Sequence, residues 1–402
     1  MPGARRPRMR PPRFAVVTIV RNEASRLPRL LASLEEFRER GGEVVVLDTG
    51  SEDGTPEVAA AAGCRVAVEP RRFNRRLTER QARRINETFS REGEGPFVEA
   101  GDRLFDFGRA REYAASLARN HVHLVVDGGD VIEALDVDFL DAAGRARGFV
   151  WMAFEIRVLS RHGWSVEAHD CFYDRRRLEW RGQAHNFLAP RAEESVPAPQ
   201  RLGRDKLLVS HHTDLEKARS HQLAGVALEA LKERGSFRWG YFLGRELVSR
   251  GHFHSALPLL LALDRPEVPP VVRSAGLCLA SQCLAGSGAP LDEVEEVLFR
   301  ASTRDSRRRD PLLRLARLGL ARGDLQSAAS LAAAALAIPV QSGFSEAESN
   351  HSTGPHAILY WALLWLGRRE EARTHFEICR ELDPGNALYA EHARFFSAAA
   401  AK

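Results

Sequence analysis

The first half of the chain alternates short apolar runs with longer stretches in which apolar residues recur every three or four positions. The short runs predict strands at residues 14–20, 43–47 and 65–68, and the longer stretches predict helices at 23–41 and 55–62. Runs that are apolar throughout are typical of strands covered on both faces of a parallel sheet. The pattern therefore predicts an α/β domain with a mainly parallel sheet over residues 14–215.

From residue 216 onward the helical period continues and strand-like runs almost disappear. Residues 358–384 resemble one tetratricopeptide repeat: Gly367 turns the chain, Ala372 and Phe376 occupy the packing positions, and Pro384 ends the second helix. Weaker copies span residues 241–260 and 315–335. One helix pair cannot bury its apolar face alone, so the copies predict an all-α domain of stacked tetratricopeptide-like repeats over 216–402, a type that contacts peptides or proteins.

Residues 71–104 interrupt the strand and helix alternation and predict an insertion with a basic helix. Seven arginines face the single acid Glu79 up to residue 84: Arg71, Arg72, Arg75, Arg76, Arg80, Arg83 and Arg84. Runs of like charge are usually solvated faces. Guanidinium groups also fork onto phosphate oxygens, so a lid or an acceptor-binding element is the second interpretation. The sequence leaves both open.

Charge and composition exclude several classes of protein. The 402 residues are 44% apolar and 28% charged, as in ordinary globular proteins, and the net charge is +4. The proline-rich segment 1–13 holds five arginines and no acidic residue. Its five positive charges exceed the net charge of +4 of the whole chain. We expect this segment to be a disordered tail, and the near-neutral remainder disfavours nucleic-acid binding.

The expected compartment is the cytoplasm. No run approaches the roughly 18 to 20 apolar residues that cross a bilayer, and the apolar run 14–20 leads directly into Arg21 rather than into a cleavage site. The cysteines number five, an odd count without paired spacing, so we expect mostly buried thiols at Cys64, Cys171, Cys278, Cys283 and Cys379.

Two strands end in acidic turns. The apolar run 124–126 leads into Asp127, Gly128, Gly129 and Asp130, and the strand at 43–47 leads into a turn with Asp48, Ser51 and Asp53. The carboxyl ends of parallel strands meet at one edge of a sheet, so these turns should converge. Asp127 and Asp130 suit a divalent cation, and Asp48 suits a base N–H or a ribose hydroxyl, although the residues of the earlier turn are also good turn and cap residues.

Several ordered segments together resemble the family 2 glycosyltransferases of the GT-A (Rossmann-like) fold. They are residues 17–23 with 46–55 (the opening motif), 106–114, the acidic turn at 127–130, 180–186, and His212. The resemblance implies an enzyme that moves a sugar from a nucleotide-diphosphate donor, by implication a UDP-sugar, to an acceptor with inversion. Tetratricopeptide-like repeats after this domain also resemble the branch with the sublancin-type peptide S-glycosyltransferases, which implies a peptide or protein acceptor.

The resemblance also implies roles for individual residues. The nucleotide pocket would comprise Thr18, Arg21, Asn22, Glu23, Asp48, Ser51 and Asp53. Arg111 would contact phosphate, Asp127 with Asp130 would hold Mg²⁺ or Mn²⁺ on the diphosphate, and His212 could complete the metal shell. Inversion requires one general base, for which His185, Asp130 and Asp170 are the candidates.

Three departures from the family pattern support an alternative function. Gly129 stands where a second metal aspartate is expected, Glu112 replaces an asparagine, and Asn186 replaces a glutamate. The alternative is a degenerate domain that acts as a scaffold through its repeats. A nicotinamide dehydrogenase is disfavoured because no glycine-rich fingerprint follows the first strand. Tyr360, Trp361 and Trp365 make a homodimer through the repeats a further expectation.

Overall fold

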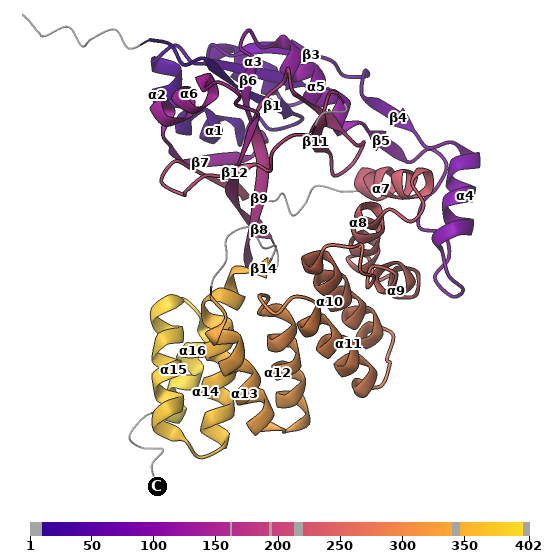
Figure 1. Ribbon diagram of the computed structural model, residues 1–402, viewed down its shortest axis with the longest axis vertical. Helices are drawn as coiled ribbons and strands as arrows, with labels where there is room; N and C mark the ends of the chain where they lie inside the picture. Colours follow the sequence, from indigo (N-terminus) through magenta and orange to yellow (C-terminus); the bar gives the residue numbers. More distant parts are fainter. Residues whose placement is uncertain (1–9, 161–162, 193–194, 213–219, 340–345, 397–402) are drawn as a thin grey trace, which may run out of the picture. The chain divides into compact units, whose positions relative to one another are not determined.

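The computed structural model describes residues 10–160, 163–192, 195–212, 220–339 and 346–396. The chain divides into two compact units (Figure 1). The α/β unit comprises residues 1–82, 99–162 and 166–229, and the helical unit comprises 83–98, 163–165 and 230–402. Each unit is described by itself below.

The α/β unit is built on one large sheet whose first half is parallel. Strand β1 (Phe14–Val20) lies between β2 (Glu43–Asp48) and β6 (Val122–Val125), β3 (Arg65–Val68) pairs with β2, and all three pairings are parallel. The order along the sheet is β3-β2-β1-β6-β9-β8-β13-β7. The carboxyl ends of β1, β2 and β6 therefore lie at the same edge, as predicted.

The second half of the sheet is mixed. Strand β9 (Gly163–Asp174) runs antiparallel to β6. Strand β13 (Leu207–His212) runs parallel to β8 (Trp151–Ser160) and antiparallel to β7 (Asp130–Leu135). Short pairs lie outside the main sheet, namely β4 (Asn74–Arg76) with β5 (Arg103–Phe105) and β10 (Leu178–Arg181) with β11 (Phe187–Pro190), while β12 (Gln200–Arg201) pairs with β8.

The prediction of one continuous helix at 23–41 is wrong, because this segment forms two helices. Helix α1 (Leu27–Ser33) ends at Leu34, whose φ of −101° and ψ of 11° leave the helical region, and α2 (Glu35–Glu39) follows. Leu34 is fully buried, and its position allows both helices to keep apolar side chains on the sheet. Further helices of this unit are α3 (Thr55–Ala61), α5 (Phe107–Leu117) and α6 (Val137–Arg145).

Burial on both faces explains the unbroken apolar runs of the parallel strands. Val16, Val17 and Val45 are at most 1% exposed. At the start of β1, the Phe14 ring lies 4.9 Å from that of Phe37 and 5.6 Å from that of Phe172. Such tilted and edge-on pairs stabilise a core beyond their burial. The parallel strands are thus a rigid base for the loops at their carboxyl ends.

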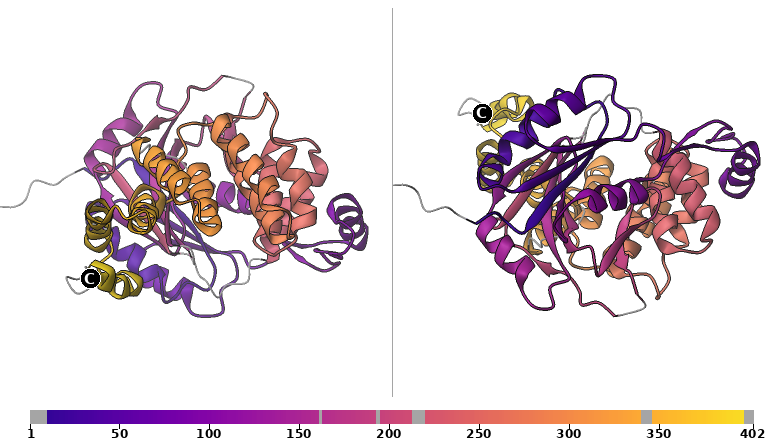
Figure 2. Two further views of the ribbon diagram at one scale, coloured as in Figure 1. Left: turned by 90° about the horizontal axis from the view of Figure 1, so that it is seen from below. Right: turned by 90° about the horizontal axis from the view of Figure 1, so that it is seen from above.

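The helical unit consists of successive antiparallel helix pairs (Figure 1 and Figure 2). They are α8 (Phe237–Val248) with α9 (Phe253–Leu261), α10 (Pro270–Gly286) with α11 (Leu291–Arg304), α12 (Asp310–Arg322) with α13 (Leu325–Ala337), and α14 (Thr353–Trp365) with α15 (Arg369–Leu382). Gly367, with a φ of +79°, makes the turn of the last pair. The α10–α11 pair was not predicted as a repeat, whereas the other three pairs were.

Further short elements complete the chain. Helix α7 (Ser220–Lys232) precedes the pairs, β14 (Glu346–Ala347) and a 3-10 turn (Glu348–His351) precede α14, and α16 (Ala387–His392) with a second 3-10 turn (Ala393–Phe396) ends the described part. No helix among the described residues is long and apolar enough to span a membrane. Four of the five cysteines are buried free thiols, as expected, and Cys64 is half-buried.

The predicted basic helix of the insertion is present as α4 (Glu79–Phe89), and the segment after it joins the helical unit. The Glu94 carboxylate accepts hydrogen bonds from the backbone N–H groups of His254 and Ser255, at 2.8 and 2.9 Å, and from the Ser255 hydroxyl. These groups lie at the beginning of α9, where backbone N–H groups lack helical partners. Residues 83–98 are therefore an integral part of the helical unit.

Candidate active site

The turn after β2 is organised by its own first residue. One carboxylate oxygen of Asp48 accepts hydrogen bonds from the backbone N–H groups of Gly50 and Ser51, both at 2.9 Å, and the other oxygen accepts one from the Ser51 hydroxyl. Asp48 is fully buried. A carboxylate that accepts several hydrogen bonds within one turn fixes the shape of that turn. Asp48 therefore supports the loop at the end of β2.

The loop after β1 is joined to this turn by several hydrogen bonds. The backbone N–H of Asn22 donates to the Ser51 hydroxyl at 2.8 Å, and its side-chain oxygen accepts from the N–H of Glu52 at 2.9 Å. Asp53 accepts from the N–H of Ala24 at 3.0 Å and from the Thr55 hydroxyl at 2.5 Å. Burial works to raise the pKa of Asp53, but these hydrogen bonds bring it below its ordinary value.

Two residues of the predicted nucleotide pocket carry conformational or polar features that point to a ligand. Asn22 has a φ of +52°, which is uncommon outside glycine. Thr18 is fully buried on β1, and its hydroxyl has no hydrogen-bond partner in the described part of the chain. Buried polar groups normally find protein, water or ligand partners. Both residues lie at or near the carboxyl end of β1.

The turn after β6 holds its first carboxylate through another helix. Asp127 follows β6, and its side chain, 41% exposed, accepts a hydrogen bond from the guanidinium of Arg111 on α5 at 2.7 Å. Arg111 is largely buried, with its guanidinium 4.8 Å from the ring centre of Trp180. The Asp127 carboxylate is thus accessible, while the Arg111 guanidinium behind it is held in place by Trp180.

The two glycines of this turn differ in their surroundings. A Cβ on Gly128 would lie 2.6 Å from a methyl group of Val20, so this position admits no side chain. A Cβ on Gly129 would lie no closer than 3.5 Å to its nearest neighbour, the Arg26 guanidinium, with a Glu23 oxygen at 3.8 Å. The close approach at Gly128 brings the loop after β1 against the acidic turn. Gly129 therefore has room for a Cβ, whereas Gly128 does not.

Asp130 is the buried partner of this turn. It accepts a hydrogen bond from the N–H of Asp127 at 2.7 Å, and its other oxygen lies 2.7 Å from Nδ1 of His211, which faces it across the β7–β13 pair. Burial raises the pKa of Asp130, an effect that the hydrogen bond with His211 opposes. His211, the neighbour of the predicted His212, contacts the acidic turn.

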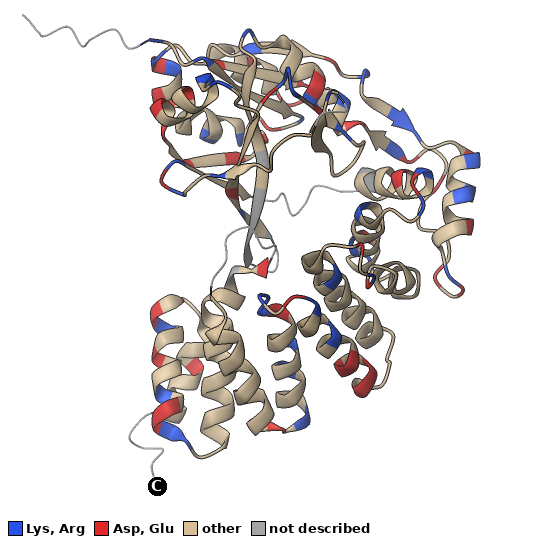
Figure 3. Cartoon of the chain, viewed as in Figure 1, with Lys and Arg blue, Asp and Glu red and all other residues tan. Residues whose placement is uncertain are grey.

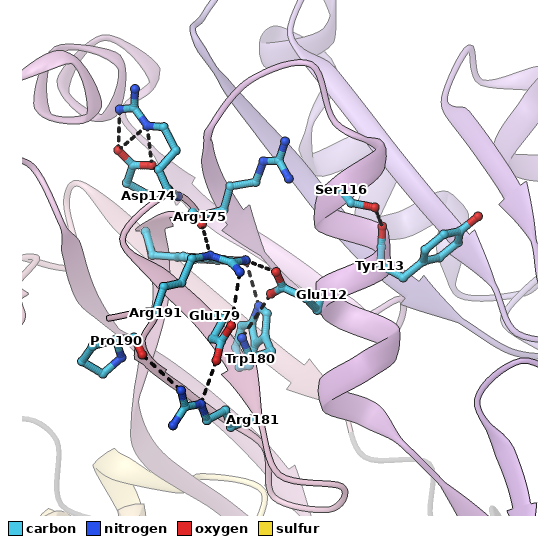
Figure 4. Close-up of polar contacts among 12 residues, drawn as sticks. Glu112, Tyr113, Ser116, Asp174, Arg175, Glu179, Trp180, Arg181, Pro190 and Arg191 are labelled. Atoms are coloured by element: carbon cyan, nitrogen blue, oxygen red, sulfur yellow. Dashed lines mark hydrogen bonds and ion pairs between the residues drawn. The ribbon is translucent and has the colours of Figure 1, made fainter. Parts of the chain in front are cut away.

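The β10–β11 hairpin carries His185 and is fixed to α5 (Figure 4). Glu112 accepts a hydrogen bond from the N–H of Trp180 at 3.2 Å and pairs with Arg191, which also lies 3.2 Å from Glu179. His185 has a φ of +48°; like Asn22, it is a non-glycine residue with a positive φ in the described chain. Backbone strain of this kind concentrates at functional sites. Glu112, a departure from the family pattern, therefore positions the hairpin.

Two further polar side chains of this hairpin, Gln183 and Asn186, were not among the predicted site residues. Gln183 is 4% exposed, and neither atom of its amide has a partner among the described residues; the same holds for the amide nitrogen of Asn186. Water or a ligand could supply the missing partners. Their positions within 180–186 are the only signal that the sequence contains. The side chains of Asp170 and His212 lie outside the described part, so their roles stay predictions.

The donor set of the acidic turn fits a metal site that a ligand completes. The described residues contain no group of three or more histidine, cysteine, aspartate or glutamate side chains arranged to hold a metal. Mg²⁺, however, is commonly bound through one or two carboxylates, with waters and substrate phosphates as the remaining ligands. The half-exposed Asp127 suits that arrangement, and Asp130 supports it from within the turn.

The likeness to known proteins is located in the strands and loops just described. Residues 15–79 match the family model Glycosyl transferase family 2. No curated protein sequence matches the chain. Among solved structures, S. aureus TarS 1-349 in complex with UDP is 12% identical, covers 68% of this chain and 88% of its own, and has a TM-score of 0.35.

Two other solved structures are also similar to parts of the chain. The mannosyltransferase PcManGT from Pyrobaculum calidifontis, in complex with GDP-Man and Mn²⁺, is 17% identical over 82% of this chain and 87% of its own, with a TM-score of 0.34. MamA is 15% identical over 42% of this chain and 91% of its own, with a TM-score of 0.32. These are distant likenesses.

The family model covers β1, β2 and the loops that join them, including Thr18, Asn22 and Asp48. The predicted fold class, a GT-A domain followed by tetratricopeptide-like helices, is confirmed, and so is the predicted class of enzyme. Residues 15–79 thus match the family 2 glycosyl transferase model, and this match supports glycosyl transfer as the class of reaction.

Proposed function

We propose that the protein transfers a sugar from a UDP-linked donor to a peptide or protein acceptor, with inversion at the sugar carbon, and that it requires Mg²⁺ or Mn²⁺. The observation that carries this proposal is the pair of Asp127 and Arg111 at the carboxyl end of β6. An accessible carboxylate and a guanidinium in contact are complementary to a metal cation and a diphosphate respectively.

On donor binding, Asp127 and Arg111 would separate, and each would bind a part of the donor complex. Asp127 would help to hold the cation, and Arg111, which stacks on Trp180, would donate to the diphosphate oxygens. Asp130 holds the turn through the N–H of Asp127. The bound cation would neutralise the charge that develops on the diphosphate as it leaves.

The chemical step needs a base on the acceptor side. The base removes the proton of the acceptor hydroxyl or thiol, the acceptor atom bonds to the sugar carbon, and the bond to the diphosphate breaks with its electron pair leaving on the diphosphate. Of the candidates, Asp130 is buried against His211, whereas His185 is half-buried on the hairpin loop in a strained conformation. We therefore assign the base to His185, with Asp170 as the second candidate.

The nucleotide would occupy the loops after β1 and β2. The Asp48 turn and Asn22 form one hydrogen-bonded frame there, and the unpaired Thr18 hydroxyl is available to a ligand or water. Arg21 and Glu23 flank Asn22 in the same loop. Hydrogen bonds from a pyrimidine and its ribose suit these donors and acceptors.

Release of UDP from a panel of UDP-sugars, with and without Mn²⁺, tests the proposal. We expect metal-dependent release, and we expect Mn²⁺ binding measured by electron paramagnetic resonance to tighten when UDP is added. A protein that neither releases UDP nor shows UDP-dependent Mn²⁺ binding would instead fit the scaffold alternative. The same assay with GDP-sugars decides the nucleotide, because activity with those donors alone would contradict the UDP assignment.

The helical unit would present the acceptor and could form a homodimer. Of the three aromatic residues considered for a dimer, Tyr360 is buried and Trp361 stacks on His392 at 4.6 Å, whereas Trp365 is 58% exposed. Trp365 is therefore the residue that supports this part of the proposal. Light scattering of wild type and Trp365→Ser tests it: a monomer at all concentrations contradicts the dimer.

A further inference from the structure

A group of exposed arginines extends along β4 and the beginning of α4, and we call residues 71–82 the arginine arm. Arg71, Arg72, Arg75, Arg76 and Arg80 are all exposed, and Glu79 is the only acid of the arm. Figure 3 shows the positive charge on β4 and along α4. The proposed transfer reaction does not use these charges.

Two of the five arginines are neutralised locally. Arg72 lies 3.2 Å from a Glu69 oxygen, with its guanidinium 3.9 Å from the ring centre of Tyr113. Arg75 lies 3.3 Å from Asp106, the residue that caps α5. Arg71, Arg76 and Arg80 pair with no carboxylate among the described residues. Their charges are therefore available to an anionic partner.

Buried side chains hold the arm in place, and the arm packs against α5, the helix that carries Arg111. Phe73 and Leu77 are at most 3% exposed, and the Phe73 ring packs against Phe105 and Tyr113 at 6.4 and 5.8 Å. Tyr113 belongs to α5, two residues beyond Arg111. The arm therefore has a fixed orientation near the proposed donor site, as an acceptor-binding element requires.

The backbone of the arm is also open to a partner. Strand β4 pairs with β5 along one edge, and the described chain supplies no strand to the other edge. A peptide can add to such an edge in extended conformation, with main-chain hydrogen bonds, while its side chains meet those of the strand. Carboxylates on that peptide would meet the guanidinium groups of Arg71, Arg76 and Arg80, none of which pairs with a carboxylate of the described chain; Arg76 donates a hydrogen bond to the Gly101 carbonyl at 2.8 Å.

We propose that the arginine arm binds an acidic segment of the peptide acceptor, rich in Asp and Glu, and so selects acceptors for the transferase. This proposal rests on the proposed function, since it names the class of acceptor. The open strand edge favours a peptide over a phosphate polymer, because a polymer without amide groups gains nothing from the edge. The competing explanation is that charge on a short edge strand only prevents unwanted pairing.

Fluorescence anisotropy with a labelled peptide that carries several Asp and Glu residues in an extended sequence tests the arm directly. We expect binding that weakens as salt rises. Changing Arg71, Arg76 and Arg80 together to Gln should weaken it about tenfold, since each exposed pair contributes modestly. The matched control changes Arg29, Arg145 and Arg147, exposed arginines of the same unit, to Gln and should bind as wild type.

Each contrary outcome overturns the proposal. Equal affinity for a peptide with Asn and Gln in place of Asp and Glu removes the role of charge, and full affinity of the arm variant removes the role of these arginines. Arm-dependent binding of polyphosphate without binding of the peptide assigns the arm to phosphate polymers. Absence of binding to either leaves edge protection as its role. No donor is present in this assay, so failure to release UDP, which would refute the proposed function, is a separate result.

Discussion

The acidic turns after β2 and β6 begin alike in sequence but are stabilised in different ways. Asp48 is buried, and both of its oxygens accept hydrogen bonds from the turn that it begins. Asp127 is 41% exposed and is held by Arg111 from another helix. Asp48 is therefore fixed by local hydrogen bonds, whereas Asp127 can exchange its partner.

This difference separates a supporting carboxylate from a reactive one. Breaking the hydrogen bonds of Asp48 would leave backbone N–H groups unsatisfied, and the cost would appear in stability. Asp127, once released from Arg111, can reach solvent or a ligand, whereas the largely buried Arg111 needs a new partner. We therefore expect substitutions in the first turn to affect folding and substitutions in the second to affect catalysis.

The largest expected effect is the loss of turnover in Asp127→Ala. Removing one group that acts on developing charge typically costs about 10²–10³-fold in rate. Some stability should be lost as well, because the largely buried Arg111 loses a carboxylate partner. Release of UDP and thermal unfolding measure the two effects. Asp138→Ala is the control, since Asp138 is an exposed carboxylate that also pairs with an arginine, Arg40; equal rates in both variants would remove Asp127 from the site.

Asp48→Ala should mainly reduce stability, whereas Asp127→Ala should mainly reduce turnover. We expect the α/β unit to lose about 2–3 kcal/mol of stability, because the N–H groups of Gly50 and Ser51 and the Ser51 hydroxyl lose their acceptor together. Hydrogen exchange of residues 44–56 measures the loss locally, and Asp48→Asn, which keeps an acceptor oxygen, should recover part of it. A variant of native stability that no longer binds UDP would show that Asp48 acts on the nucleotide instead.

The glycines of the second turn allow a matched comparison. Gly128→Ala should cost about 1–3 kcal/mol, because its Cβ would press against Val20 at 2.6 Å. Gly129→Ala should change stability by about 0.5 kcal/mol or less, since its Cβ has room. Urea unfolding of the two variants measures this difference. Equal losses would mean that the turn, and not the contact with Val20, determines the requirement for glycine.

The parts of the fold that depend on local pattern were predictable from the sequence. The parallel strands β1 and β2 are mainly apolar runs buried on both faces, and three of the helix pairs carry repeat spacing. The break at Leu34 was not predicted, because the apolar period continues through it. The α10–α11 pair was missed as a repeat because it lacks the spacing of the other copies. The mixed half of the sheet depends on long-range pairing that no local pattern records.

The candidate site shows the same limit. Sequence position was enough to bring Asp48 and Asp127 to one edge of the sheet, because parallel strands share their direction. It could not choose between His211 and His212, since alternate residues of a strand face opposite ways and the register with β7 was unknown. The role of Glu112 as the anchor of the β10–β11 hairpin also depends on a contact across 68 positions of sequence.

The smallest expected effect concerns the charge that joins the first turn to the loop after β1. Hydrogen bonds from Ala24 and Thr55 hold the pKa of Asp53 below its usual 3.8, against the effect of burial. The carboxylate therefore contributes stability above its unfolded pKa, and this contribution is lost as the pH falls through the lower folded pKa.

Because Asp53 is exposed, we expect Asp53→Ala to cost only about 1 kcal/mol at neutral pH. Urea unfolding of both proteins across the acid range should show this gap closing as wild type becomes protonated. Asp53→Asn keeps only one of the two acceptor oxygens and does not titrate, so its stability relative to Asp53→Ala should not change with pH. A gap between wild type and Asp53→Ala that is constant with pH would contradict the role of the charge.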